Sequence, residues 1–259
     1  KFMSKIAEAF QNKKAFIPFV TAGDPDLETT EKILLAMQEN GADLIEIGIP
    51  FSDPVAEGIV IQQADERALA SGTTTDKIFD MVEKIKDRIH VPMVFMTYAN
   101  VIFVYGTERF AKRSQELGMS GVIVPDVPFE EKEELDSVFR QFGLDVISLI
   151  APTSKDRIKA IAAEAKGFVY CVSSLGVTGV RTTINKGVAD MIREVKKVKD
   201  IPCAIGFGIS TPEQAKEMSE ISDGVIVGSA IVRIVGEYGR DCVGKVGEYV
   251  KQMKEAMNS

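Results

Sequence analysis

The chain of 259 residues contains one histidine and three cysteines, and this scarcity limits the chemistry available to it. Cys171, Cys203 and Cys242 are odd in number and far apart, which indicates reduced thiols in a cytoplasmic protein. Cys171 lies inside a strand pattern, and His90, the single histidine, precedes another strand. Neither a Cys/His catalytic dyad nor a metal site with the usual ligand spacing is therefore expected.

Basic clusters and long apolar runs are also missing. The formal net charge is −7, and lysine and arginine form no patch, so sequence-independent binding of nucleic acid is not expected. No run approaches the length of a membrane span, and residues 1–14 fit a short amphipathic helix rather than a signal peptide. The expected location is the cytoplasm, with no attachment to membranes or nucleic acid.

Strand and helix patterns alternate along the whole chain without a linker or a low-complexity stretch. The strand patterns cover residues 15–21, 43–48, 92–97, 121–125, 145–150, 168–172, 202–206 and 224–228. Eight such βα units in 259 residues, 45% of them hydrophobic, predict a single (β/α)₈ TIM-barrel domain over residues 1–259. A doubly wound open sheet is the alternative.

Helix boundaries are marked by capping residues and glycines. A helix over residues 27–39 ends at Asn40-Gly41, and extra helices are expected at the N-terminus, over 59–69 and over 246–257. After the seventh strand, Ser210 and Glu213 have the spacing of a capping box, with Pro212 in the first turn. This spacing predicts a helix that begins next to Ser210.

A glutamate inside the second strand pattern is the first candidate for chemistry. Glu46 alternates with Ile45 and Ile47, so its side chain lies on the opposite face of the strand. The segment is apolar on both faces, as in parallel strands covered by helices. Burial raises the pKa of a carboxyl group there, which suits proton transfer near neutral pH. The alternative is a structural glutamate paired with an arginine or lysine.

Glycine-bearing strand ends form the second candidate site. The seventh strand continues into Gly206-Phe207-Gly208, and the eighth into Gly228-Ser229, each before a helix pattern. Small residues let backbone N–H groups approach a phosphate, and phosphate sites in barrels recur after strands seven and eight. The loop over 173–181 is rich in small residues and is either a lid or an ordinary connection.

Other polar residues near strand ends narrow the reaction class. Tyr170 is either a core aromatic or a substrate contact. Asp53 and Glu57 follow the second strand and are either solvated or, if close to Glu46, its partners in acid–base chemistry. These strand ends supply no lysine for a Schiff base and no carboxylate/histidine cluster for a metal-dependent aldolase. Acid–base chemistry on a phosphate ester is the remaining expectation.

The chain resembles the tryptophan synthase alpha subunit in seven segments that occur in order across nearly its whole length. They are FIPFVTAGDPDLETT, LIEIGIPFSDPVAEG, MTYANVIFVYG, VIVPDVPFEE, CVSSLGVTGVR, GFGISTPEQ and DGVIVGSAIV. The resemblance implies a barrel that splits indole-3-glycerol phosphate into indole and glyceraldehyde 3-phosphate by a retro-aldol reaction, without metal, Schiff base or cofactor in this chain. It also implies a beta-subunit partner with pyridoxal phosphate (PLP), which receives the indole through a tunnel in an α₂β₂ complex and joins it to serine.

The resemblance also implies roles for individual residues. Glu46 matches the catalytic proton shuttle, and Glu57 matches an acceptor for the indole N–H as positive charge develops there. Thr178 would orient the catalytic groups when the loop closes, and Asp53 would communicate with the partner. The phosphate-binding positions and their neighbours are Gly179, Gly206, Phe207, Gly208, Gly228 and Ser229. The indole pocket would be lined by Phe19, Met96, Tyr98, Val127 and Tyr170.

The loop after the second strand departs from the family pattern of an aspartate followed by Gly-Pro. The chain has Glu57-Gly58-Ile59, which keeps the negative charge, adds a methylene and removes the φ constraint of proline. Two alternatives to a synthase subunit stay open. One is a stand-alone indole-3-glycerol phosphate lyase, and the other is a non-catalytic subunit that senses a phosphate ligand.

Overall fold

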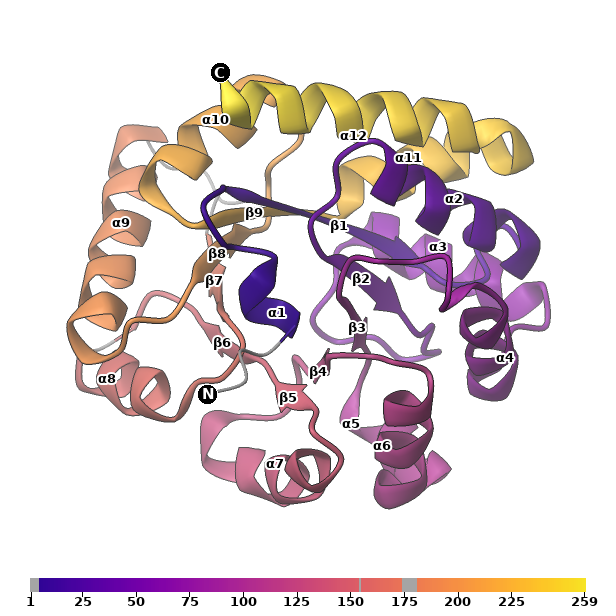
Figure 1. Ribbon diagram of the computed structural model, residues 1–259, viewed down its shortest axis with the longest axis horizontal. Helices are drawn as coiled ribbons and strands as arrows, with labels where there is room; N and C mark the ends of the chain where they lie inside the picture. Colours follow the sequence, from indigo (N-terminus) through magenta and orange to yellow (C-terminus); the bar gives the residue numbers. More distant parts are fainter. Residues whose placement is uncertain (1–4, 154, 174–180) are drawn as a thin grey trace.

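The computed structural model describes residues 5–153, 155–173 and 181–259, with side chains from residue 186 onward in the last range. Within these ranges, nine parallel strands form the wall of a barrel in the order β5-β4-β3-β2-β1-β9-β8-β7-β6 (Figure 1). The strands are β1 (Ala15–Thr21), β2 (Ile45–Gly48), β3 (Met93–Met96), β4 (Gly121–Ile123), β5 (Asp145–Val146), β6 (Ser148–Ile150), β7 (Val169–Val172), β8 (Cys203–Gly206) and β9 (Gly224–Val227). This arrangement confirms the predicted barrel and not the open sheet.

The two edges of this sheet belong to one continuous stretch of chain. β5 pairs with β4, and β6, which starts two residues after β5 ends, pairs with β7. Ile147 lies between the halves, and its N–H still donates to the carbonyl of Val122 at 2.9 Å. The fifth predicted strand is therefore divided at Ile147, and it closes the barrel by joining β4 to β7.

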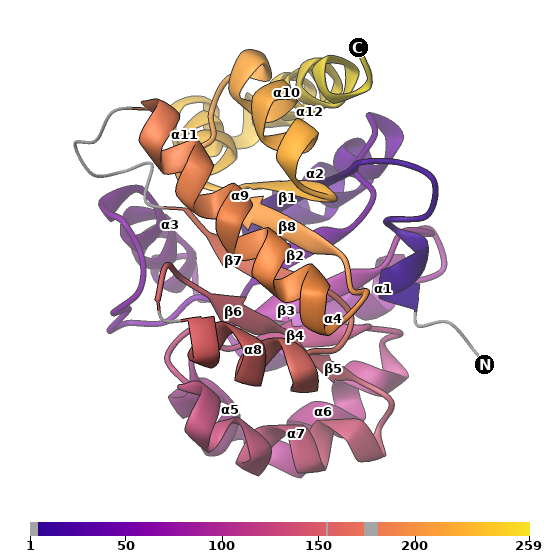
Figure 2. The same cartoon turned by 90° about the vertical axis from the view of Figure 1, so that its left-hand side faces the viewer.

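Helices surround the barrel, as two perpendicular views show (Figures 1 and 2). The helices are α1 (Lys5–Glu8), α2 (Leu27–Glu39), α3 (Ile59–Ala70), α4 (Thr75–Ile85), α5 (Ala99–Tyr105), α6 (Thr107–Glu116), α7 (Lys132–Gln141), α8 (Lys155–Glu164), α9 (Arg181–Val198), α10 (Pro212–Ile221), α11 (Ser229–Tyr238) and α12 (Val243–Asn258), with 3₁₀ turns η1 (Phe129–Glu131) and η2 (Gly239–Cys242). The predicted helix over 27–39 is confirmed, and the three extra helices exist as α1, α3 and α12. No helix in the described ranges combines the length and apolar character needed to span a bilayer.

The start of α10 corrects the predicted capping box by one residue. Thr211 is the N-cap, and its side chain accepts a hydrogen bond from the Gln214 N–H. The Gln214 side chain in turn accepts from the backbone N–H groups of Ser210 and Thr211, at 2.8 and 3.1 Å. A glutamine can close a capping box as well as a glutamate, and the spacing from Thr211 to Gln214 is the one used.

Residues on β2 alternate between two apolar layers, as predicted. Ile45 and Ile47 belong to the layer between the strands and the outer helices. Leu44 belongs to the layer inside the barrel, together with Val94 of β3. Glu46 lies between Ile45 and Ile47 in the sequence, so its side chain points to the opposite, inward face, where it is buried. The strand pattern therefore places its carboxyl group in the barrel interior.

The short helix α1 lies over one end of this interior, near the centre of the ring of strands in Figure 1. Ile6 of α1 is fully buried, and the ring of Phe10 packs 5.6 Å from the ring of Phe168. Phe168 precedes β7 and belongs to the inner layer, so α1 covers the amino ends of the parallel strands. The opposite end carries the loops that follow each strand.

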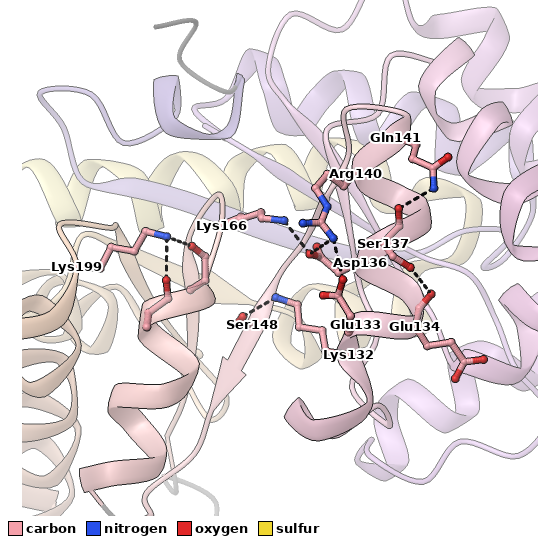
Figure 3. A network of polar contacts seen from close by, with 12 residues as sticks. Lys132, Glu133, Glu134, Asp136, Ser137, Arg140, Gln141, Ser148, Lys166 and Lys199 are labelled. Carbon is pink, nitrogen blue, oxygen red and sulfur yellow. Dashed lines mark hydrogen bonds and ion pairs between the residues drawn. The ribbon is translucent and has the colours of Figure 1, made fainter.

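A polar network on the outside of the barrel holds α7 against the divided strand (Figure 3). Lys132 is buried and donates from Nζ to the Ser148 hydroxyl at 2.9 Å, and its burial lowers the pKa of the ammonium group. One turn later, Asp136 accepts from Lys166 at 2.7 Å and lies 3.8 Å from Arg140. These contacts connect α7 with β6 and with the segment before β7.

Candidate active site

A cavity of about 310 Å³ lies at the carboxyl ends of the strands. Its walls include Phe19 of β1, Glu46 of β2, Met96 of β3 and Tyr170 of β7. Backbone that follows β8 and β9 forms the remaining side, together with the loop between β2 and α3. Active sites of βα barrels occupy this end, because the loops there can vary without disturbing the core.

Glu46 reaches the bottom of the cavity without a compensating charge. Its side chain is 1% exposed, and Oε1 has no hydrogen-bond partner among the described residues. Within the described ranges, no lysine, arginine or histidine forms an ion pair with it, so the alternative of a structural glutamate paired with a cation is not observed. Burial disfavours the charged form and raises the pKa of Glu46 to about 8.

Tyr170 lies beside Glu46 inside the barrel. Burial, and to a smaller extent the Glu46 carboxylate, raise the pKa of its hydroxyl well above the usual value. Its ring packs against Phe207, with centroids 6.1 Å apart. A Cβ atom on Gly206 would overlap the Tyr170 hydroxyl, which explains the glycine there. Gly206 does not line the cavity itself but directly precedes Phe207, which does, so its place beside the phosphate stays a prediction.

The turn after β8 exposes backbone to the cavity. Phe207 and Gly208 both have left-handed backbone conformations, with φ of 77° and 75°. A non-glycine residue is rarely found there, and such strain is commonly seen at binding sites. The Ser173 hydroxyl lies 3.0 and 2.8 Å from the carbonyl oxygens of Gly206 and Phe207 and supports the turn. The predicted contacts Thr178 and Gly179, in the loop over 173–181, lie outside the described residues.

The amino end of α11 forms the neighbouring wall. Gly228 is the N-cap, and Gly228, Ser229 and Ala230 line the cavity. The first-turn N–H groups of a helix have no acceptor within the helix and carry partial positive charge, so they favour an anion. Arg233, one turn further along α11, also lines the cavity and adds a full positive charge. Phe207, Gly208, Gly228 and Ser229 are therefore brought together as the sequence predicts.

The loop between β2 and α3 brings a second carboxyl group to the cavity. Glu57 is part of the lining, and its buried Oε2 accepts no N–H or hydroxyl hydrogen bond from the described residues. The backbone carbonyl of Glu57 accepts from Gln62 Nε2 at 2.8 Å. The Glu57 side chain is also hydrogen-bonded to that of Asp65 on α3. Burial raises the pKa of Glu57, and the bond from Asp65 partly offsets this effect.

Three predicted site residues lie away from the cavity. Tyr98 is 2% exposed, and its hydroxyl accepts from the Ala56 N–H at 3.1 Å, so it supports the β2 loop and does not itself line the cavity. Val127 lines a separate cavity of about 380 Å³ beside β4 and β6. Both residues follow the ends of their strands, where the chain has already turned toward the next helix. Asp53 is exposed on the β2 loop and accepts from the Ser52 hydroxyl at 2.6 Å.

Residues that sequence reasoning missed also surround the cavity. Ile61 and Ile226 add apolar surface, and Ser210 and Arg233 add polar groups. The signal for Arg233 was its place four residues after Ser229, on the same face of a helix. The signal for Asp65 was its spacing of four residues from Ile61, which puts an acidic residue on the buried face of α3.

The arrangement combines three chemical capacities in one cavity. A buried carboxyl group with a pKa of about 8 can both accept and release a proton near neutral pH. Apolar walls suit a flat aromatic group, and the turn after β8 with the end of α11 suits a phosphate. Proton transfer on an aromatic phosphate ester fits this combination.

Comparisons with known proteins identify relatives over nearly the whole chain. Residues 6–258 match the sequence model of a family described as tryptophan synthase alpha chain. The tryptophan synthase alpha chain of Lacticaseibacillus casei is 47% identical over 257 residues, covering 99% of this chain and 97% of that protein. The crystal structure of tryptophan synthase subunit alpha from Legionella pneumophila has a TM-score of 0.89 at 35% identity, covering 99% of each chain. A tryptophan synthase complex from Pyrococcus furiosus contains a chain with a TM-score of 0.83 at 36% identity, with 93% of this chain and 98% of that chain covered.

Proposed function

Because the chain belongs to the tryptophan synthase alpha chain family and is a carbon–carbon lyase of tryptophan biosynthesis, we propose that the cavity around Glu46 is where it splits indole-3-glycerol phosphate. The products are indole and glyceraldehyde 3-phosphate. The cavity contains the acid–base group, the apolar surface and the anion-binding backbone that this reaction requires.

Glu46 is the proton shuttle in this proposal. In its acid form it protonates indole C3, which places a positive charge on the ring nitrogen. As a carboxylate it then takes the proton of the C3′ hydroxyl, so that an aldehyde forms while the bond between C3 and C3′ breaks and its electron pair returns to the ring. Glu46 ends the cycle protonated, as it began. A pKa of about 8 keeps both forms accessible at neutral pH.

Glu57 stabilises the charged intermediate. The indole N–H becomes a stronger donor when C3 is protonated, and the Glu57 carboxylate in the cavity wall is its acceptor. A preorganised charged acceptor of this kind lowers a barrier by about 3 kcal/mol. Phe19, Met96 and Tyr170 provide the surface against which the indole ring packs.

The phosphate is held at the opposite wall. Backbone N–H groups at Gly208, Gly228 and Ser229 approach it, and Arg233 contributes charge. Gly179 and Thr178 remain proposed contacts from the loop over 173–181, with closure of that loop excluding water. Holding the phosphate fixes the distance between the reacting carbons and Glu46.

A beta-subunit partner is consistent with the family, since relatives have been solved as tryptophan synthase complexes. We propose an α₂β₂ assembly in which indole passes to a beta subunit that carries PLP, while this chain needs no cofactor. Asp53, exposed on the β2 loop, is proposed to communicate with that partner. A cytoplasmic location is consistent with three free, buried cysteines.

The observation that carries the proposal is Glu46, which is buried without an ion-pair partner among the described residues, in the wall of a cavity that also offers an anion site. The test is indole release from indole-3-glycerol phosphate, measured with and without a tryptophan synthase beta subunit. Slow release that rises sharply on mixing supports a synthase subunit, because partner binding stabilises the closed state. Fast release without the partner indicates an independent lyase, and no release in either case indicates a ligand-sensing subunit.

Glu46→Gln tests the assignment of the shuttle. The variant should lose at least about 10³-fold in kcat, because glutamine cannot exchange protons, while glycerol 3-phosphate binds within about 3-fold of wild type. Asp43→Asn is the matched control, since Asp43 is a buried carboxylate at the other end of the same segment, paired with Lys13 and Lys254. It should lower stability and leave kcat unchanged. Retained turnover in Glu46→Gln would defeat the proposal.

A further inference from the structure

Asp65 is a buried carboxyl group on an otherwise apolar helix face. It is 5% exposed and shares the buried side of α3 with Ile61, Ala64 and Ala68. Within the described ranges, no cation forms an ion pair with it. Arg67, two residues further on, already makes a bidentate pair with the Asp24 carboxylate. An acidic residue in such a place needs another source of stabilisation.

That stabilisation comes from Glu57. The two side chains are hydrogen-bonded to each other, and the Phe51 N–H approaches Asp65 Oδ2 at 3.4 Å. Two ionised carboxylates have acceptors and no donor, so a hydrogen bond between them requires that one carries a proton. The pair therefore binds one shared proton at neutral pH.

The proton belongs on Asp65. Burial, and then the negative charge of Glu57, raise the pKa of Asp65 to about 8, whereas the hydrogen bond from Asp65 favours the charged form of Glu57. Asp65 is also the more deeply buried of the two. At neutral pH the arrangement is thus an aspartic acid that donates to a glutamate carboxylate.

This arrangement determines what Glu57 presents to the cavity. Its side chain lines the cavity and is also in hydrogen-bond contact with Asp65. We propose that Asp65 is a positioning residue, which in its protonated form donates to Glu57, keeps that side chain charged, and holds it at the cavity wall as an acceptor for an N–H group of the substrate. The inference rests on the proposed function and adds a residue to its machinery.

Other groups near the pair set its electrostatic environment. Asp24, from the β1–α2 loop, adds a negative field that raises the pKa of Asp65, and Arg67 largely neutralises it through contacts of 2.8 and 2.9 Å. Tyr98, from the end of β3, stays neutral because its pKa is raised to about 12. Among the described residues that line the cavity, the remaining charged or titratable groups are Glu46 of β2, Tyr170 of β7 and Arg233 of α11.

Two substitutions separate the hydrogen-bond donor from the titrating proton. Asp65→Asn keeps a donor that never ionises, so kcat/KM at pH 7 should stay within about 3-fold of wild type. Above pH 8 the wild-type pair becomes doubly negative and loses its donor. The kcat/KM of the Asn variant divided by that of wild type should therefore rise. Glu46 is present in both proteins, so its own titration cancels in this ratio.

Asp65→Leu removes the donor and leaves Glu57 in apolar surroundings. The charge on Glu57 is then lost near neutral pH, and kcat/KM should fall about 10- to 100-fold, more at pH 6.5 than at pH 9. A buried leucine in place of an unpaired acid is not expected to unfold the protein. Glu66→Gln is the matched control, because Glu66 is the adjacent acidic residue of α3 and is exposed. It should leave all of these quantities unchanged.

A double-mutant cycle decides whether Asp65 acts through Glu57. In the Glu57→Gln background, adding Asp65→Leu should change kcat/KM by less than about 3-fold, because the interaction it removes is already lost. A full additional loss in the double variant, or an Asp65→Asn variant as impaired as Asp65→Leu with an unchanged pH profile, overturns the proposal.

Failure of the proposed function would look different. Wild-type protein that releases no indole, alone or with the beta subunit, refutes the lyase assignment. The shared proton is then judged from stability, which should fall less steeply between pH 5 and pH 8 in Asp65→Asn than in wild type. Equal slopes in the two proteins would remove the basis for a protonated Asp65.

Discussion

Replacing Glu46 with glutamine removes one titratable proton from the interior of the barrel, and the effect on stability follows from the burial of this carboxyl group. The pKa of about 8, against an ordinary value of 4.5, means that the folded state keeps a proton that the unfolded chain releases. At about 1.4 kcal/mol per pKa unit, full ionisation costs the folded state at most about 5 kcal/mol. Relaxation and water entry reduce this cost, so we expect about 2 to 5 kcal/mol.

The sign of the pH dependence is fixed by the raised pKa. Below pH 4.5 both states of the wild type are protonated, and glutamine and glutamic acid should be nearly equivalent. Between pH 4.5 and 8 the unfolded chain loses its proton first, so wild-type stability falls as pH rises, whereas the Gln variant has no such slope at this position. For a chain of this length, about 2 °C per kcal/mol gives a variant that melts about 4 to 10 °C higher at pH 8.5.

Thermal or urea unfolding of both proteins between pH 4.5 and 8.5 measures this difference directly. Contributions of Glu57 and Asp65 are common to the two proteins and cancel. Glu66→Gln, which changes an exposed carboxylate, should follow the wild-type curve at every pH. A difference that stays constant with pH, or a wild type that gains on the variant as pH rises, would show that Glu46 is hydrated or paired, and the reasoning from burial would be refuted.

Three further predictions concern the surroundings of Glu46. Tyr98→Phe removes the acceptor of a β2-loop N–H and should lower kcat/KM about 10-fold and stability by about 1 kcal/mol. Steady-state indole release and urea unfolding measure the two effects, and an unchanged kcat/KM would contradict a supporting role for Tyr98. Gly206→Ala should lower the free energy of unfolding by about 2 kcal/mol, because the new methyl group overlaps the Tyr170 hydroxyl. In a Tyr170→Phe background the same unfolding assay should show a smaller loss. Arg233→Gln should raise KM and the Kd of inorganic phosphate several-fold with kcat nearly unchanged. The difference in Kd between variant and wild type should shrink at high salt, which screens the charge of Arg233. Calorimetric titration that detects no change in Kd would exclude Arg233 from the phosphate site.

The parts of the fold that could be predicted depend on periodicity. The alternation of Glu46 with Ile45 and Ile47 gave both the strand and the face, because a strand side chain has two possible directions and one of them was filled by isoleucine. The division of the fifth strand at Ile147 could not be predicted, since closure of a barrel depends on pairing with β4 and β7 far away in the sequence. The capping box of α10 was displaced by one residue, because Ser210 and Thr211 are both good N-caps.

Within the site, backbone features were easier to predict than loop contacts. The glycines after β8 and β9 lie where parallel strands end at a common edge, so their convergence follows from the fold. The directions of the Tyr98 and Val127 side chains depend on how the chain leaves each strand, which residue propensity does not encode, and neither residue lines the cavity around Glu46. The partner of Asp65 could be identified only in the folded structure, where the β2 loop brings Glu57 next to α3.

Helix α1 and the turn after it cover the amino ends of the strands, where Phe10 packs against Phe168. The cavity around Glu46 opens at the opposite, carboxyl end of the strands. A proton carried by Glu46 therefore exchanges with the medium through the mouth of this cavity. Whatever covers the mouth during turnover thereby isolates the carboxyl from bulk water, and the hydrogen taken from the hydroxyl is then the one that remains on Glu46 for the next substrate.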